Sequence, residues 1–112
     1  MLGVALGLFT IVAGFGLRLA KHVFTGQMSS SRSRFLHVGT AAAGSVLVIA
    51  SALNGDQRLW INIGLAVVVI ALGVALCYQR AKHLQPKALV VAHGGIAVLC
   101  YAILAYFVFS PQ

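Results

Sequence analysis

Acidic side chains are almost absent from this chain. Its 112 residues include a single acidic residue, Asp56, which lies outside the long apolar stretches. Those stretches therefore carry no carboxylate. Proton-coupled transporters generally need an ionisable group inside a membrane span, often Asp or Glu. The shortage of acid argues against that class of protein and against metal sites built from carboxylates.

Charge of either sign and cysteine are scarce as well. Only 8% of the residues are charged, whereas 61% are hydrophobic. A soluble domain of this size cannot hide so much apolar surface, because small folds expose a large share of their area. The two cysteines, Cys77 and Cys100, fall inside apolar runs, where a free thiol behaves as a small hydrophobe. We expect no disulfide between them, and we expect the solvent of this chain to be partly lipid.

The length of the chain then allows about four spans at roughly 20 residues each. The fold class we predict is an all-α membrane protein, with four transmembrane helices in an antiparallel up-down bundle that forms one domain, residues 1–112. The expected spans are residues 2–24, 35–53, 59–80 and 87–109. Basic residues follow the first apolar stretch instead of preceding it, so we interpret that stretch as a retained helix and not a signal peptide.

The basic residues are distributed unevenly over the three connections. Seven of the eight lie in or beside the first and third connections: Arg18, Lys21, Arg32, Arg34, Arg80, Lys82 and Lys87. The eighth, Arg58, stands next to Asp56 in the second connection. By the positive-inside rule the two basic connections face the cytoplasm and both termini lie outside, as expected in a bacterial inner membrane. The net charge of +7 then indicates contact with anionic lipid and not with nucleic acid.

The two halves of the chain, residues 1–54 and 59–112, resemble each other. The matched positions are His37 and His93, Gly39 and Gly95, Ala41 and Ala97, and the triplets Ala20-Lys21-His22 and Ala81-Lys82-His83. In this alignment the first connection is the longer by about five residues. Such a repeat has two hairpins in the same orientation, which places the second and fourth helices diagonally across the bundle. Convergence is the alternative, because every helix is rich in Ala, Gly, Val and Leu.

His37 and His93 each lie near the start of a span and at similar depth. The diagonal of a square bundle with helix axes 8–10 Å apart is about 13 Å. Two imidazoles that reach inward across it leave room for one metal but not for direct contact, as two axial ligands of a haem iron do. Gly39, Gly94 and Gly95 remove side chains beside the proposed ligands, although small residues also let cofactor-free helices pack closely.

Two other metal arrangements are open. The four histidines, His22, His37, His83 and His93, can supply a zinc or copper site, with Cys77 the only thiol near the right end. Alternatively, His22 and His83 hold a second haem, or they and the nearby Arg and Lys residues face the haem propionates. The plainest interpretation gives these two histidines no role beyond the membrane interface. The two histidine layers are close for two macrocycles, so we favour one haem.

The arrangement resembles the small membrane b-type cytochromes, which are four-helix haem proteins. The resemblance is carried by His37 with Gly39, by His93 with Gly94 and Gly95, and by the four-span plan. It implies haem b and one-electron transfer with a quinone, a redox protein or an oxygen species. Larger members hold two haems on opposite sides of the membrane, whereas all four histidines here lie towards one side.

Three questions stay open at this stage. A cofactor-free accessory or structural subunit and a small-solute transporter are the alternative functions. Nothing in the sequence marks a catalytic residue for a reaction beyond electron transfer. The sequence also leaves association into a homo-oligomer undecided.

Overall fold

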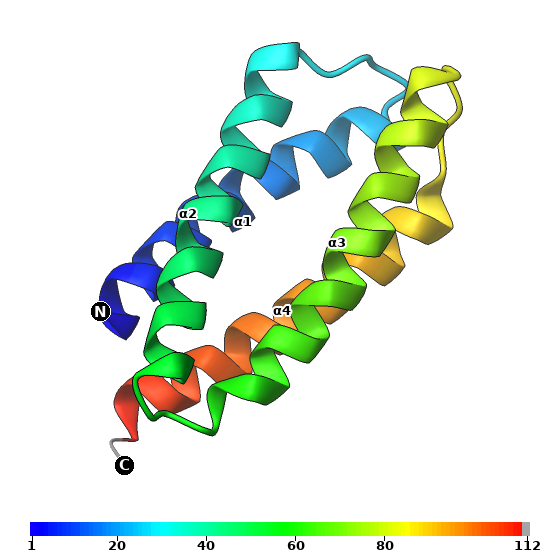
Figure 1. The fold of residues 1–112 in the computed structure, drawn as a ribbon. Coiled ribbons are helices and arrows are strands. Elements are labelled where there is room, and N and C mark those ends of the chain that lie inside the picture. The colour runs from blue at the N-terminus through cyan, green and yellow to red at the C-terminus, as the bar shows by residue number, and fades with distance from the viewer. Residues whose placement is uncertain (111–112) are drawn as a thin grey trace.

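The structure is a computed structural model that describes residues 1–110, and these form four helices with no strand. The helices are α1 (Leu2–Phe24), α2 (Ser31–Leu53), α3 (Leu59–Ala81) and α4 (Lys87–Phe109). Figure 1 shows them as a bundle of antiparallel helices. Each helix is long and apolar enough to cross a membrane. The predicted all-α, four-span fold is therefore confirmed.

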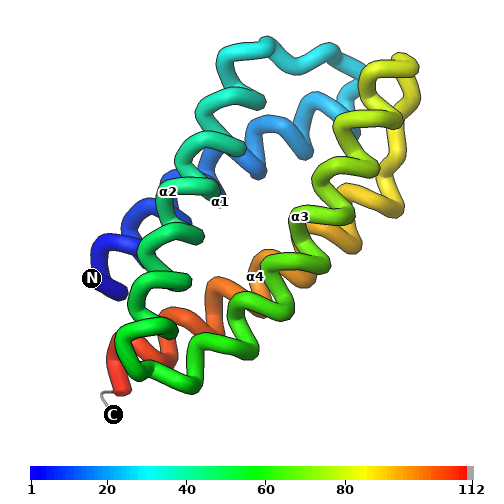
Figure 2. The backbone as a smooth tube through the Cα atoms, viewed as in Figure 1, coloured from blue at the N-terminus to red at the C-terminus, as the bar shows by residue number. Residues whose placement is uncertain are grey.

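Two hairpins, α1–α2 and α3–α4, pack side by side. Besides its hairpin partner, α1 contacts α4 and α2 contacts α3. The backbones of α1 and α3 are not in contact, and neither are those of α2 and α4. The tube in Figure 2 shows this up-down course. The second and fourth helices are thus diagonal neighbours, as predicted, and side chains from both can reach the middle of the bundle.

The helix that we predicted over residues 35–53 begins earlier, at Ser31. The preceding residue, Ser30, is its N-cap, and the Ser30 hydroxyl oxygen accepts a hydrogen bond from the Ser33 amide at 3.1 Å. A serine cap satisfies one of the backbone amides left free at a helix start. The apolar run begins at Phe35, where the helix can enter lipid, whereas the Ser30 cap places the start of the helix at Ser31.

The two Ala-Lys-His triplets do not hold equivalent places. Lys21 and His22 lie inside the last turn of α1, whereas Lys82 and His83 follow the end of α3. The connections themselves, residues 25–30 and 82–86, are nearly equal in length, so the expected difference of five residues is wrong. In each connection one residue has a left-handed backbone: Gly26 (φ 74°) in the first and His83 (φ 60°) in the third.

We call the end of the bundle with these two connections the basic end. The start of α1, the end of α4 and the α2–α3 connection lie at the opposite end (Figure 1). The buried apolar core, which consists of Ala5, Val48, Ala52, Leu59 and Leu104, lies near that opposite end. The helices pack tightly there and diverge around a cavity closer to the basic end.

Arg58 ties the opposite end together. Its guanidinium forms an ion pair with Asp56 at 3.0 Å and donates hydrogen bonds to the Ser110 and Phe107 carbonyls. It also stacks over the Phe107 ring, 4.7 Å from the centroid. One side chain before α3 thereby holds the last turn of α4, where carbonyls lack helical partners.

Candidate functional site

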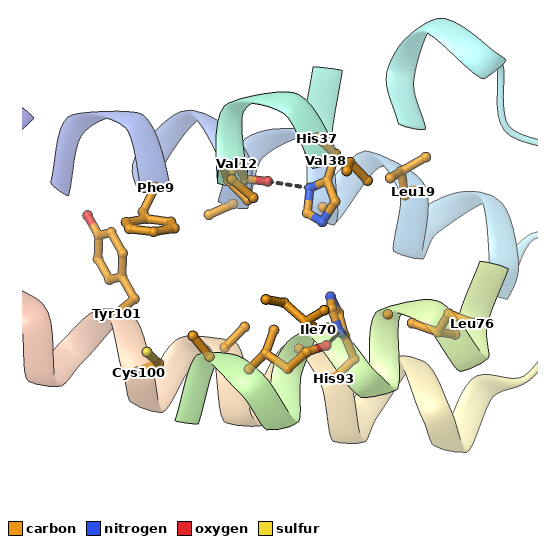
Figure 3. A pocket seen from close by; sticks show the side chains of 18 of the residues that line it. Phe9, Val12, Leu19, His37, Val38, Ile70, Leu76, His93, Cys100 and Tyr101 are labelled. Atoms are coloured by element: carbon orange, nitrogen blue, oxygen red, sulfur yellow. Dashed lines mark hydrogen bonds between the residues drawn. The ribbon is translucent and has the colours of Figure 1, made fainter. Parts of the chain in front are cut away.

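A cavity of about 990 Å³ lies between the two hairpins and is lined by residues from all four helices. Its walls are mainly Val, Ile, Leu, Ala and Gly, and both His37 and His93 line it. Its volume is at the upper end of the range usual for small-molecule and cofactor sites. Figure 3 shows the two imidazoles on opposite walls, pointing toward each other.

His37 projects from α2 and is held by α1. Its Nδ1 lies 3.0 Å from the Val12 carbonyl oxygen. The ring reaches that carbonyl across Gly16, one helical turn further along α1. A Cβ at Gly16 would lie 3.1 Å from Cε1 of His37 and 3.6 Å from its Nδ1. The glycine therefore provides the space in which the ring lies.

His93 is held by α3 in the same way. Its Nδ1 lies 2.9 Å from the Val69 carbonyl oxygen. A Cβ at Gly73 would lie 3.1 Å from Cε1 of His93 and 3.6 Å from its Nδ1. In both hairpins a valine carbonyl, a glycine one turn later and a histidine of the next helix form one unit, so the two histidine environments are alike.

These hydrogen bonds fix which ring nitrogen is free. Only an N–H can bond to a carbonyl oxygen, so in each ring Nδ1 carries the proton, and Nε2 of the neutral imidazole keeps its lone pair. The second ring nitrogen of each histidine points toward the other ring in Figure 3. Two acceptors thus face one another across the cavity, an arrangement that favours an electron-poor group between them.

The spacing of the two rings fits a single metal. Their centroids are 6.3 Å apart. Two metal–nitrogen bonds of about 2 Å each, with ring radii of about 1 Å, place the centroids of two opposed axial imidazoles about 6 Å apart. A direct hydrogen bond would bring the nitrogens to about 3 Å and the centroids to about 5 Å. The donors suit an ion that takes two opposed nitrogens.

A site built from protein ligands alone does not form. Within residues 1–110 no three His, Cys, Asp or Glu side chains come together as a group that could hold a metal ion. The four histidines therefore do not gather into the predicted zinc or copper site, since His22 and His83 do not line the cavity that His37 and His93 share. Zinc in particular takes three or four protein ligands. A haem brings four nitrogens of its own, so two histidines complete it.

The other predicted site residues are dispersed. Gly94 lines the cavity beside His93, whereas Gly39 and Gly95 are exposed and do not line it. His22 and His83 do not line it either. His22 lies in the last turn of α1, where its Nδ1 is buried and has no hydrogen-bond partner. His83 is exposed in the third connection.

The polar groups of the cavity wall gather at its two ends. Ser29, Arg34 and Arg80 line the basic end, and Ser45, Asn62, Cys100 and Tyr101 line the half towards the opposite end. The Asn62 amide donates to the Cys100 carbonyl at 2.9 Å, while its Oδ1 is buried with no partner. The Tyr101 hydroxyl lies 2.7 Å from that of Thr10. The histidine layer is therefore flanked by a cationic side and a neutral polar side.

Sequence reasoning missed the supports of the two rings. It predicted no contact of either histidine with Gly16 or Gly73, and it did not consider the Val12 and Val69 carbonyls. Alignment of the helices from Leu2 and Leu59, where α1 and α3 begin, would have paired these residues. The Ala-Lys-His alignment is shifted from that register by about one helical turn, which obscured the match.

Compared with protein-family models, with curated proteins and with solved structures, the chain matches none of them.

Proposed function

We propose that this protein is a membrane b-type cytochrome that binds one haem b between its two hairpins, with His37 and His93 as axial ligands. The haem iron would supply one-electron redox chemistry. The chain's own residues would orient the ligands and would exclude water with the apolar walls of the cavity. The electron partner is a quinone, a redox protein or an oxygen species.

The observation that carries this proposal is the pair of opposed imidazoles. Each Nδ1 is held by a backbone carbonyl of the neighbouring helix, and the centroids are 6.3 Å apart. A metal-bound histidine usually donates its other N–H to a carbonyl or a carboxylate, which fixes both the tautomer and the ring direction. Both rings already have that support, so little reorganisation is needed for both to bind one iron.

A cofactor-free structural subunit is the second candidate. The hydrogen bonds from His37 to α1 and from His93 to α3 join helices within each hairpin, which is what a structural role requires. That role leaves unexplained why both free nitrogens face each other across a cavity of about 990 Å³. Packing alone favours filled interiors, since a void forfeits dispersion contacts. We therefore favour the cytochrome.

The proposed orientation follows from charge. The basic end has seven Lys or Arg residues in or beside its connections, and the opposite connection has Arg58. We propose that the basic end faces the cytoplasm of a bacterial cell and that the haem lies nearer that face. A reporter that folds only in the cytoplasm should be inactive when fused to the C-terminus and active when inserted in connection 25–30.

The proposal is tested by purifying the protein, supplying haem and recording visible spectra in the oxidised and reduced states. We expect stoichiometric uptake of one haem per chain and the Soret and α-bands of a six-coordinate, bis-histidine iron. His37→Ala and His93→Ala should each lose that spectrum. His22→Ala and His83→Ala are matched controls, because neither residue lines the cavity.

Two results would contradict the proposal. A purified, folded protein that takes up no haem would leave the structural role as the better explanation. If His37→Ala and His93→Ala both kept the bis-histidine spectrum, the ligands would be other residues. Redox activity toward a quinol or an oxygen species is to be tested on the protein that has bound haem.

A further inference from the structure

Arg80 is a buried cation in the wall of the cavity. Its relative exposure is 7%, the lowest of any charged residue among residues 1–110. The guanidinium donates to the Leu84 carbonyl at 3.1 Å and to the Gln27 carbonyl in the first connection. Arg80 thus links both connections of the basic end while part of it faces the cavity.

The chain offers Arg80 no acidic partner. Asp56 is the only Asp or Glu in the sequence, and it pairs with Arg58 at the opposite end of the bundle. The charges around Arg80 have its own sign, because the basic end carries the other Arg and Lys residues of the connections. Removing a cation from water without pairing it is costly, and neutral carbonyls compensate for only part of that cost.

Arg80 lines the cavity, so an anion inside the cavity can act as its counter-ion. Arg34 lines the same end of the cavity and lies three residues before His37 on α2. Arg80 lies seven residues beyond Gly73, the contact of His93, which is about 10 Å along α3. An anion near Arg80 is therefore within one small molecule's length of the histidine layer.

We infer that the basic end of the cavity is an oxyanion site in which Arg80 is the main cation and Arg34 assists. This inference rests on the proposed function and extends it: the oxyanions are the two carboxylate side chains of the haem, which therefore point to the basic end. A guanidinium suits this task, since its planar fork of five N–H donors matches a carboxylate. His22 and His83 take no part.

The test compares haem with haem dimethyl ester, in which both carboxylates are neutral esters. Each is titrated into the purified protein in nanodiscs of phosphatidylcholine, and binding is followed by the Soret band. The wild type should bind haem about tenfold or more tightly than the ester, because hydrogen bonds to charged groups are the stronger ones. Arg80→Gln should reduce this preference to near one, and Arg80→Lys should restore part of it.

Arg18→Gln is the matched control. It removes the same charge from the same end of the bundle, but Arg18 is exposed and does not line the cavity. We expect Arg18→Gln to keep the wild-type preference for haem over the ester. Because the wild-type comparison needs no substitution, the inference stays testable even if Arg80→Gln fails to fold.

The outcomes separate the two claims. If neither haem nor ester binds, the proposed function fails. If both bind equally tightly to the wild type, the cytochrome stands and the oxyanion inference is overturned. A lipid phosphate is the other oxyanion that Arg80 could bind. If the wild type shows no preference for haem over the ester, and added phosphatidylglycerol stabilises the protein only when Arg80 is present, Arg80 binds lipid. That result would overturn its assignment to haem.

Discussion

Gly16 lies against the ring of His37 so closely that a Cβ in its place would be 3.1 Å from Cε1 of the imidazole. Gly73 stands in the same relation to His93. Contacts this short force the neighbouring group to move. A Cβ alone needs the ring to move by a few tenths of an ångström, whereas a larger side chain needs a larger displacement. Since each ring is also bonded to a carbonyl one turn before its glycine, we expect that larger displacement to break the bond and to turn Nε2 from its direction.

A large side chain at Gly16 or Gly73 should therefore weaken haem binding. We expect Gly16→Leu and Gly73→Leu each to reduce haem affinity by about tenfold or more, the equivalent of an overpacking cost of about 1–3 kcal/mol. Soret titration measures the effect. Gly14→Leu is the control, because nothing lies within 4 Å of a Cβ built at Gly14. Equal affinities for the Gly14 and Gly16 variants would show that the glycine contact is irrelevant.

His83 should be dispensable for haem binding and mildly unfavourable for folding. Its φ of 60° is in the left-handed region, where glycine has no steric cost. We expect His83→Gly to stabilise the protein by about 0.5–1 kcal/mol in unfolding by SDS in mixed micelles, with haem affinity unchanged. Gly26→Ala is the reverse experiment and should destabilise, since Gly26 has φ 74° and a Cβ there would be 3.0 Å from the Gln85 amide nitrogen. A loss of haem in His83→Gly would restore His83 as a candidate site residue.

Asn62 should stabilise the α3–α4 hairpin only modestly. Its amide donates to the Cys100 carbonyl at 2.9 Å, whereas its buried Oδ1 has no partner. Interhelical hydrogen bonds in membranes contribute about 0.6 kcal/mol on average, and the unpaired oxygen offsets part of this gain. We expect Asn62→Ala to change the free energy of unfolding by less than about 1 kcal/mol. Ser45→Ala is the comparison, because the Ser45 hydroxyl bonds within its own helix, to the Ala41 carbonyl. A cost of several kcal/mol at Asn62 would mean that Oδ1 has a partner in the folded protein.

The Asp56–Arg58 pair should make stability sensitive to acid. The hydrogen bonds from the Arg58 side chain hold the pKa of the Asp56 carboxyl below its ordinary value. The folded protein therefore binds this proton less readily than the unfolded chain. The stabilisation is fully present above the ordinary Asp pKa of about 3.9 and is lost as the pH falls through the lowered folded value.

The measurement is the difference in unfolding free energy between the wild type and Asp56→Asn across pH. We expect a constant difference from about pH 5 to pH 8 that shrinks below about pH 4. Taking the difference removes the titration of the histidines, which both proteins share. A difference that instead grew in acid would contradict the lowered pKa of Asp56.

Much of the fold follows from composition and charge. Long apolar runs without carboxylates specify helices in lipid, and turn residues such as Asn54 and Gly55 specify where the chain reverses. The start of α2 was misplaced because Ser31 to Arg34 are polar, although the Ser30 cap and helical geometry place them in the helix. The Ala-Lys-His triplets gave a wrong alignment of the two halves, because Lys21 and His22 lie inside a helix whereas Lys82 and His83 follow one.

The residues of the candidate site were likewise predicted only in part. The sequence singles out His37 and His93, since a polar ring in an apolar helix is unusual and two such rings match. It does not distinguish Gly16 from Gly14 or Arg80 from Arg18. In a helix that is apolar on every side, periodicity does not reveal which side faces the bundle, because lipid and protein interior are equally apolar.

By itself the sequence therefore determined four antiparallel helices long and apolar enough to cross a membrane, a basic end and a matched histidine pair on diagonal helices. Only the tertiary structure decided how each helix is rotated about its axis. That rotation sets Gly16 and Gly73 under the rings, gives each Nδ1 a carbonyl and leaves each Nε2 free. It also buries Arg80 without an acid. These are consequences of packing between helices, which local sequence pattern does not encode when every face is apolar.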